Sequence, residues 1–212
     1  EPVENLVASV DEYNVTLSRD FEVNKNDINK RGEVVLSESF ESGEIPEGWQ
    51  TIDADGDGES WFIHFTGHTG NYCITSASFS NWSGPLTPDN YLITPEMDLA
   101  SGGTLTYWVC AQDESSPADH YAVYASTSGN SIDDFETPLF EETIEAKDYK
   151  GEIGSKGTND LGTWYQRSVE LPIGTKYVAF RHFDCTNAFR MNIDDIEITS
   201  EGTISGYFFE IH

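Results

Sequence analysis

Six residues in the first third of the chain have the composition and spacing of a cation-binding loop. Residues 53–58 read Asp-Ala-Asp-Gly-Asp-Gly, with an aspartate at every second position and glycines that allow a tight turn. Ca²⁺ takes about 6–8 oxygen ligands in flexible geometry, and three carboxylates so close together repel one another unless a cation lies between them. An ordinary acidic turn is the alternative, because Asp-Gly pairs also occur in hairpins. We expect a calcium-binding loop.

The run matches the start of an EF-hand loop, but an EF-hand is excluded on two counts. The twelfth position, which requires a bidentate acid, is occupied by His64. Neither flank has a helical pattern, because Pro46 and Gly48 precede the run and the strand-like Trp61–Ile63 follows it. The loop is therefore predicted to lie on a β scaffold.

A second acidic group lies near the end of the chain, in the strand-like segment from Asn192 to Ile198. Strand alternation predicts that Asp194 shares a face with Ile196 and points toward the core. A buried carboxylate requires a metal ion or a positive partner. Two candidates are Arg181, in the neighbouring apolar segment, and a calcium ion shared with the 53–57 loop.

Other reactive or aromatic residues point less clearly to a function. His182, Asp184 and Cys185 suggest a nucleophilic site, but no third orienting group or oxyanion loop is evident, so a structural role is favoured. The histidines lack the spacing of a zinc site. Among five tryptophans, Trp61 and Trp82 lie in loop-rich segments and are the best candidates for contact with a ligand, although core packing is the commoner role of tryptophan.

The charge balance excludes several classes of partner. The 212 residues include 38 acidic and 11 basic side chains, for a formal net charge of −27. Nucleic acids and anionic membranes need a cationic face, so neither is expected, and no apolar run is long enough to insert into a membrane. This excess of carboxylates also destabilises a compact fold by self-repulsion, which bound calcium would relieve. The three cysteines cannot all pair within the chain, and we expect buried thiols.

The elements that must position these residues are almost all strands. Helical periodicity is nearly absent, and only Asp133–Phe135 could form a helical turn. Short segments rich in β-branched and aromatic residues, separated by Gly, Pro, Asn and Asp, predict an all-β fold, an antiparallel two-sheet jelly-roll β-sandwich. The predicted strands are Val34–Phe40, Tyr72–Ser76, Tyr91–Thr94, Thr104–Ala111, His120–Ser126, Leu139–Ile144, Trp164–Glu170, Lys176–Phe183 and Asn192–Thr199.

Composition divides the chain into a main domain and flanking pieces. Residues 24–32 have too little apolar content to pack and are interpreted as a linker, and residues 33–200 as the calcium-binding jelly-roll domain. Residues 1–23 hold two strand-like pieces, too few for an independent domain, and residues 201–212 hold one more. We expect these pieces to associate with each other or with segments outside this chain. Residue 1 is not followed by a secretion signal, and we expect that the signal was removed.

The sequence from residue 34 to 199 resembles, in order, the cleaved-adhesin domains of gingipains and related haemagglutinins. The matching segments are Leu-Ser-Glu-Ser-Phe-Glu (36–41), Thr-Ile-Asp-Ala-Asp-Gly-Asp-Gly (51–58), Pro-Asp-Asn-Tyr-Leu-Ile-Thr-Pro-Glu (88–96), and residues 103–113, 120–126, 174–183 and 193–196. The resemblance implies a jelly roll of the galactose-binding-like or MAM-like type, structural calcium and export to the bacterial cell surface or medium. It also implies a non-enzymatic module of a larger protein that binds host extracellular or blood proteins of the fibrinogen, fibronectin or haemoglobin class.

The resemblance further implies a set of calcium ligands and a second module. Between Glu41 and Asp53 this chain carries one extra residue, around 43–47, which we expect a loop to absorb. Residues 1–23 and 201–212 resemble strands of a fibronectin-type module into which the main domain would be inserted. Ser39 and Glu59 would contribute backbone carbonyls. The implied ligands are Ser39, Glu41, Asp53, Asp55, Asp57, Glu59, Asn90 and an acid of the pair Asp194 and Asp195.

Two other classes of function compete with the adhesin hypothesis. Jelly rolls with structural calcium also bind sugars, so a carbohydrate-binding module that contacts glycans is the main alternative. A glycoside hydrolase would need paired acids in a deep pocket, and with so many acids some pair would meet that distance by chance. A hydrolase is therefore the least favoured class.

Overall fold

The computed structural model describes residues 6–11, 14–19, 32–113, 115–144 and 162–202. The chain divides into two compact units, of which one runs from Gly32 to Gly202. In the other unit, β1 (Leu6–Asp11) and β2 (Asn14–Arg19) form an antiparallel pair. The strand predicted near the C-terminus, in residues 203–212, lies outside the described residues, so the assignment of a fibronectin-type module stays a prediction.

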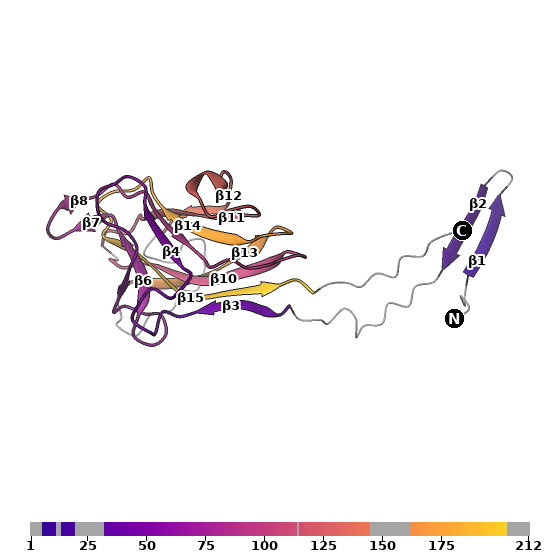
Figure 1. Ribbon diagram of the computed structural model, residues 1–212, viewed down its shortest axis with the longest axis horizontal. Helices are drawn as coiled ribbons and strands as arrows, with labels where there is room; N and C mark the ends of the chain where they lie inside the picture. Colours follow the sequence, from indigo (N-terminus) through magenta and orange to yellow (C-terminus); the bar gives the residue numbers. More distant parts are fainter. Residues whose placement is uncertain (1–5, 12–13, 20–31, 114, 145–161, 203–212) are drawn as a thin grey trace. The chain divides into compact units, whose positions relative to one another are not determined.

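The unit from Gly32 to Gly202 is a sandwich of two antiparallel sheets (Figure 1). The first sheet has the strand order β13-β10-β15-β6-β5, and β3 also pairs with β15. Its strands are β3 (Val34–Glu38), β5 (Phe62–His64), β6 (Cys73–Ala77), β10 (Gly103–Ala111), β13 (Thr163–Leu171) and β15 (Arg190–Ser200). The second sheet has the order β12-β11-β14-β9-β4. Its strands are β4 (Gln50–Asp53), β9 (Asn90–Ile93), β11 (His120–Ser126), β12 (Pro138–Thr143) and β14 (Tyr177–His182).

The core forms where the apolar faces of the two sheets meet. In β10, the buried residues Leu105, Tyr107 and Val109 alternate with partly exposed ones, as expected for a strand with one buried face. Tyr107 packs edge-to-face on Phe180 of the other sheet, with ring centroids 5.0 Å apart. Its hydroxyl lies 2.8 Å from that of Tyr121, so the polar ends of both buried rings are paired. Each such side chain contributes about 1.5–3 kcal/mol when fully buried.

The predicted all-β antiparallel sandwich is confirmed. All nine predicted strands are present, with ends shifted by at most two residues, and the predicted helical turn is the 3₁₀ turn η1 (Ile132–Asp134). Four short strands were not predicted: β4, β5, and the pair β7 (Phe79–Ser80) and β8 (Gly84–Pro85), which forms a small hairpin. Among the described residues, no helix is long and apolar enough to cross a bilayer.

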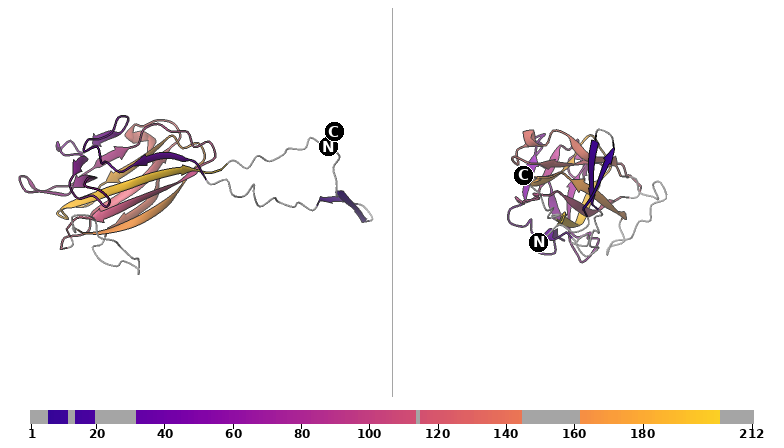
Figure 2. Two further views of the ribbon diagram at one scale, coloured as in Figure 1. Left: turned by 90° about the horizontal axis from the view of Figure 1, so that it is seen from below. Right: turned by 90° about the vertical axis from the view of Figure 1, so that its right-hand side faces the viewer.

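The strand register defines two ends of the sandwich. β15 begins at Arg190, opposite Ala77 of β6, and ends at Ser200, opposite Gly103 of β10. The β7–β8 hairpin follows β6 at the first end, which we call the Arg190 end, and it projects from the sandwich there (Figures 1 and 2). The loop after β13 lies at the opposite, Ser200 end, because Leu171 also pairs with Gly103. The two ends thus carry different sets of loops.

Candidate metal centre

The acidic loop begins where β4 ends, at the Arg190 end of the sandwich. Asp53, the last residue of β4, pairs with Asn90, the first residue of β9. The Ala54 amide donates a hydrogen bond to the Asp89 carbonyl at 2.8 Å, which extends this pairing by one residue. The edge of the second sheet therefore fixes where the loop starts.

Hydrogen bonds to Asp53 fold the loop back on itself. Its two carboxylate oxygens accept from the amides of Gly56 at 2.7 Å and Gly58 at 2.8 Å. Both glycines have left-handed φ angles, +74° and +89°, and a Cβ on either would meet no atom within 4 Å. Backbone conformation, and not space, therefore requires glycine at these positions. The turn brings carboxylate oxygens of Asp53, Asp55 and Asp57 within 4.8 Å of one another.

The first two of these carboxylates differ in how readily they hold a proton. The amide of Gly58, and after it that of Gly56, lowers the pKa of Asp53, against the opposing effect of burial. Burial, the hydrogen bond with Asp53 and the charge of Asp57 raise the pKa of Asp55. A cation between the three side chains would favour the ionised form of each.

Asn90 indicates independently that a cation fits beside this loop. The residue is 1% exposed, and its Nδ2 donates to Ser76 Oγ at 3.2 Å, but its buried Oδ1 has no hydrogen-bond partner in the part of the chain that the structure describes. Leaving a buried acceptor unpaired costs about 1–3 kcal/mol. Because Asn90 is the cross-strand partner of Asp53, its Oδ1 and the loop carboxylates form a set of hard oxygens, which are the ligands that Ca²⁺ prefers. The residues present therefore fit a calcium ion.

Glu41 belongs to a second acidic group, which is organised by the loop of residues 67–72. Its Oε1 accepts hydrogen bonds from the amides of Asn71 and Tyr72, both at 2.8 Å. Gly70 has a φ of +62°, and a Cβ there would overlap the Glu41 carboxylate. Glycine is thus required at this position both for the backbone angle and for space.

Asp194 is fully buried beneath the same loop. Its Oδ2 accepts from the amides of His68 at 2.7 Å and Thr69 at 3.2 Å, and its Oδ1 accepts from the amide of Asp195 at 2.7 Å. The Asp195 carboxylate contacts His68 Nδ1 at 2.7 Å and accepts from Thr69 Oγ1 at 2.6 Å. Burial, and then the adjacent charge of Asp195, raises the pKa of Asp194 to about 7. A divalent cation would stabilise this crowded pair in its ionised form.

The predicted orientation of Asp194 toward the core is wrong. The register between β10 and β15 shifts between Thr106 and Trp108, and Asp195 has a left-handed φ of +46°. A β-bulge of this kind inserts a residue and reverses the alternation of faces. Ile193 and Ile196 therefore both lie in the core, and Asp194 lies opposite Trp108 on the outer face of the sheet.

Arg181, one of the two partners considered for Asp194, is paired with another residue. Arg181 forms a two-point ion pair with Asp89 instead, at 2.7 and 2.8 Å. The side-chain contacts of Asp194 belong to the loop of residues 67–72, on the first sheet, and the acidic loop lies on the second. The hydrogen bonds thus divide the candidate ligands between two loops, and a calcium ion shared by both loops stays a prediction. We call the two sets of candidate ligands the β4 group (Asp53, Asp55, Asp57, Asn90) and the β15 group (Glu41, Asp194, Asp195).

Comparison with known proteins identifies the family. The model of the cleaved adhesin domain matches residues 33–198, which is most of the chain. The chain belongs to the cleaved adhesin family. It is 50% identical to Hemagglutinin A of Porphyromonas gingivalis strain W83 over 209 residues, covering 95% of this chain and 10% of that protein. The chain therefore spans about a tenth of the length of the curated relatives that it matches.

Solved structures of the family have the same fold. The K1 cleaved adhesin domain of Lys-gingipain from P. gingivalis W83 is 50% identical, covers 80% of this chain and 100% of that domain, and superimposes with a TM-score of 0.72. A carbohydrate-binding module that recognises mannan superimposes with a TM-score of 0.53 at 11% identity, covering 81% of this chain and 99% of that module, which shows a shared fold alone.

The remaining ligand positions implied by the cleaved adhesin resemblance fall beside the two groups. Ser39 follows β3, whose last residue, Glu38, pairs with Ile196, so Ser39 lies near the β15 group. The Glu59 amide donates to Asp57 Oδ1 at 2.7 Å, which places Glu59 at the β4 group. Each group of this cleaved adhesin chain thus has beside it one of the two residues to which the resemblance assigns a backbone-carbonyl role.

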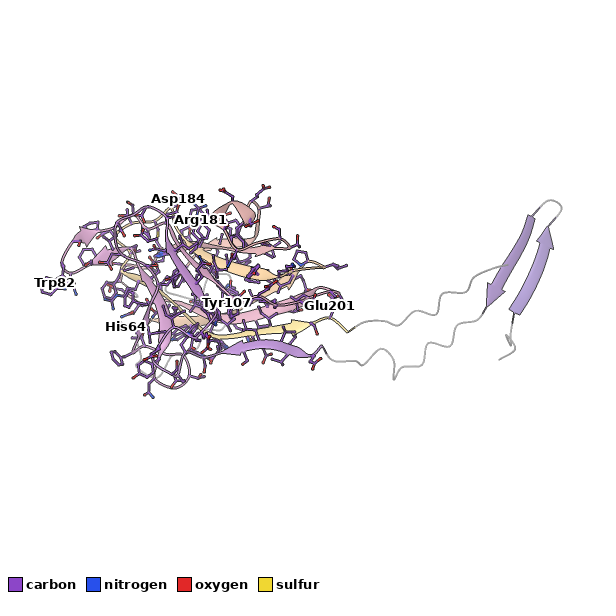
Figure 3. The ribbon with its side chains drawn as sticks, in the orientation of Figure 1. His64, Trp82, Tyr107, Arg181, Asp184 and Glu201 are labelled. Carbon is purple, nitrogen blue, oxygen red and sulfur yellow. The ribbon has the colours of Figure 1, made fainter. Side chains whose placement is uncertain are left out.

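The two candidate ligand-contacting tryptophans have opposite environments. Trp61 is only 3% exposed, and its Nε1 donates to the Asn90 carbonyl at 3.1 Å. Trp61 therefore has the core role that is the commoner one for tryptophan, and as a candidate for ligand contact it is ruled out, because the ring packs in the core beside the β4 group. Trp82 is 98% exposed between β7 and β8 and projects from the end of the molecule (Figure 3).

Sequence reasoning missed the loop of residues 67–72, which organises the β15 group. It holds Glu41 and Asp194 mainly through backbone amides, and amides leave no signal in side-chain composition. Two glycines, at 67 and 70, were the available indication of a tightly folded loop.

Proposed function

We propose that this chain is an exported, non-enzymatic adhesin module, part of a larger cell-surface or secreted protein. Its calcium ions hold the acidic loop at the Arg190 end and the loop of residues 67–72 in a fixed arrangement. Membership of the cleaved adhesin family supports this proposal. So do the unpaired Asn90 Oδ1 and the crowded carboxylates of both acidic groups, since each would be stabilised by a hard divalent cation.

The exposed Trp82 is the observation that carries the binding role. Large apolar side chains on soluble surfaces usually bury more of their area, and tryptophan is among the residues that contribute most to protein interfaces. Ser78, at the base of the hairpin, fixes its position: the Ser78 amide donates to the Phe189 carbonyl at 3.0 Å, and the Ser78 carbonyl accepts from Leu86 at 2.9 Å. These bonds hold the base of the hairpin in place, and the indole itself has only two side-chain torsions to fix on binding.

The proposed partners are host extracellular or blood proteins of the fibrinogen, fibronectin or haemoglobin class. With a net charge of −27, the module should approach basic patches on such proteins fastest. Association should therefore slow as salt is added, because steering between separated charges is screened within about 8–10 Å at physiological ionic strength.

Surface plasmon resonance against immobilised fibrinogen, fibronectin and haemoglobin tests the proposal. We expect binding in calcium, weaker binding in chelator, and at least a tenfold loss for Trp82→Ala. The matched control is Ile173→Ala, because Ile173 is 74% exposed but lies beyond Leu171 at the Ser200 end. Equal affinities for both variants and the unaltered chain would refute the role of the hairpin.

A carbohydrate-binding role is the second candidate. The fold shared with carbohydrate-binding modules favours it, and an exposed indole also stacks on sugar rings. A glycan array distinguishes the two roles: saturable, Trp82-dependent binding to glycans, with no binding to the deglycosylated forms of the three proteins, would favour the carbohydrate role.

A further inference from the structure

A cluster of a carboxylate, an imidazole and a thiol lies at the Arg190 end, outside the two acidic groups. Asp119 precedes β11, His182 ends β14, and Cys185 is in the loop that follows. Asp119 and His182 are fully buried, and Cys185 is partly exposed. The pairing of Tyr121 with His182 brings the start of β11 beside the end of β14. One ligand atom from each of the three side chains lies within 4.8 Å of the others.

The three ligand atoms converge on one side of the imidazole ring. His182 Nε2 lies 3.1 Å from Asp119 Oδ1 and 3.1 Å from Cys185 Sγ, and these two atoms are 3.9 Å apart. In a nucleophilic relay the thiol and the carboxylate contact different ring nitrogens. Here both contact the same nitrogen, so the cluster encloses a single point and does not form a relay.

The spacing of these atoms suits a coordinated ion. Tetrahedral zinc, with bonds of about 2.0–2.2 Å to nitrogen and oxygen and about 2.3 Å to sulfur, holds its ligand atoms roughly 3.3–3.6 Å apart. The observed separations of 3.1, 3.1 and 3.9 Å fall within a few tenths of an ångström of that range. Small side-chain rotations would therefore complete the coordination.

Neighbouring hydroxyls orient the ligands, as outer partners do in metal sites. Ser76 Oγ receives a hydrogen bond from Asn90 Nδ2 at 3.2 Å and lies 2.8 Å from His182 Nδ1. It can accept the proton of Nδ1, which leaves the lone pair of Nε2 directed at the enclosed point. Ser78 Oγ donates to Asp119 Oδ1 at 2.6 Å.

The second oxygen of Asp119 is left without a partner even though the cluster holds one positive charge. Burial lowers the pKa of His182, but its hydrogen bonds to Asp119 and Cys185 outweigh burial and raise that pKa to about 9. Oδ2 is buried without a hydrogen-bond partner, and among the described residues the only ion-pair partner of Asp119 is His182. A carboxylate taken out of water needs a cation or several donors. A metal ion at the enclosed point would supply that charge.

We propose that Asp119, His182 and Cys185 bind a divalent transition-metal ion, represented by Zn²⁺, at a site separate from the calcium groups. Imidazole and thiolate select such ions over Ca²⁺, which prefers oxygen. The exposed side of Cys185 provides an entry route and leaves a fourth position for water, as in open zinc sites. Binding releases two protons to solvent, one from the Cys185 thiol and one from the His182 imidazolium, because the thiolate and the neutral imidazole are the ligands.

Cobalt titration of the full chain, with calcium present throughout, tests the site. We expect one equivalent of Co²⁺ to produce a thiolate-to-cobalt charge-transfer band and strong visible bands of a four-coordinate ion, both removed by one equivalent of Zn²⁺. Cys185→Ala and Asp119→Asn should abolish these bands. Cys110→Ala is the matched control, since it also removes a thiol but lies outside the cluster, and this variant should keep the bands. A cluster neutralised by a proton alone would show no bands in the unaltered chain, which would overturn the proposal.

A second measurement needs no substitution. Alkylation of the unaltered chain with iodoacetamide, followed by peptide mass spectrometry, reports each cysteine separately. We expect Zn²⁺ to slow labelling of the partly exposed Cys185 at least tenfold, and Ca²⁺ at the same concentration to leave it unchanged. Labelling of Cys185 at equal rates with and without Zn²⁺ would overturn the proposal.

Discussion

Two tryptophans at the Arg190 end are expected to have different roles, Trp61 in stability and Trp82 in binding. Trp61 is buried and hydrogen-bonded to the Asn90 carbonyl, whereas Trp82 is almost fully exposed. Trp61→Ala should therefore lower the free energy of unfolding by about 3–5 kcal/mol, and Trp82→Ala should change it by no more than about 0.5 kcal/mol. Urea unfolding in calcium measures both. A comparable loss for the two variants would mean that the β7–β8 hairpin is part of the core.

Asp55 offers a test of whether the β4 group binds calcium. Because burial and the neighbouring Asp53 and Asp57 raise the pKa of Asp55, its charge is unfavourable in the metal-free protein and useful only when a cation is present. Asp55→Asn should raise or leave unchanged the melting temperature in chelator, and lower it in calcium. Asp98→Asn is the control, because Asp98 is an exposed acid outside both groups. If Asp55→Asn changed the melting temperature by the same amount and in the same direction in chelator and in calcium, Asp55 would not be a calcium ligand.

At the scale of elements, strand positions follow from sequence, but the groups that the strands bring together do not. Alternation predicted nine strands, because a strand of four or more residues with one buried face leaves a period of two. β5, β7 and β8 have only two or three residues and leave no such pattern. β4 has four residues, but its burial does not alternate, because one exposed residue is followed by three partly buried ones. The bulge at Asp195 was missed because alternation assumes an unbroken period. Asp194 was therefore predicted to lie on the wrong face of the sheet.

Contacts between elements that are far apart in the sequence could not be predicted from it either. His182 and Cys185 are close in sequence, but Asp119 is 63 positions before His182, and only the pairing of β11 with β14 brings it near. Asp53, Asp55 and Asp57 could be predicted because one short loop holds all three.

The loop of residues 67–72 can be tested with a pair of glycine substitutions. Gly70→Ala and Gly84→Ala both place a side chain at a left-handed φ, at a cost of about 1–2 kcal/mol each. A Cβ at Gly84 meets no atom within 4 Å, whereas one at Gly70 overlaps the Glu41 carboxylate. Gly70→Ala should therefore lower the free energy of unfolding, measured with urea, by more than Gly84→Ala does. It should also reduce the stabilisation of the fold by calcium. Equal costs and equal calcium responses would show that Glu41 is not positioned by this loop.

At the scale of the whole molecule, 38 acidic side chains against 11 basic ones must be held in one compact unit. Each calcium site, at a free concentration a hundred times its Kd, should add about 2.7 kcal/mol, or roughly 5–11 °C in melting temperature for a domain of this size. Chelation should remove this gain, and salt should restore part of it by screening the carboxylates. Differential scanning calorimetry in calcium and in chelator, at low and high salt, measures both effects. An unchanged melting temperature in excess chelator would contradict structural calcium.

The gain from calcium should also depend on pH, with a sign set by Asp194. Burial and Asp195 raise its pKa from 3.8 to about 7, so the metal-free native state binds this proton more tightly than the unfolded chain does. The stability linked to this group is therefore full below about pH 4 and is lost as the pH rises through about 7. Calcium needs the ionised carboxylate. From about pH 8 to about pH 5.5, the metal-free melting temperature should rise and the gain from calcium should shrink, and Asp194→Asn should flatten both trends. A calcium gain that stays constant over this range would place Asp194 outside the site, because a ligand that takes up a proton at about pH 7 must compete with the ion.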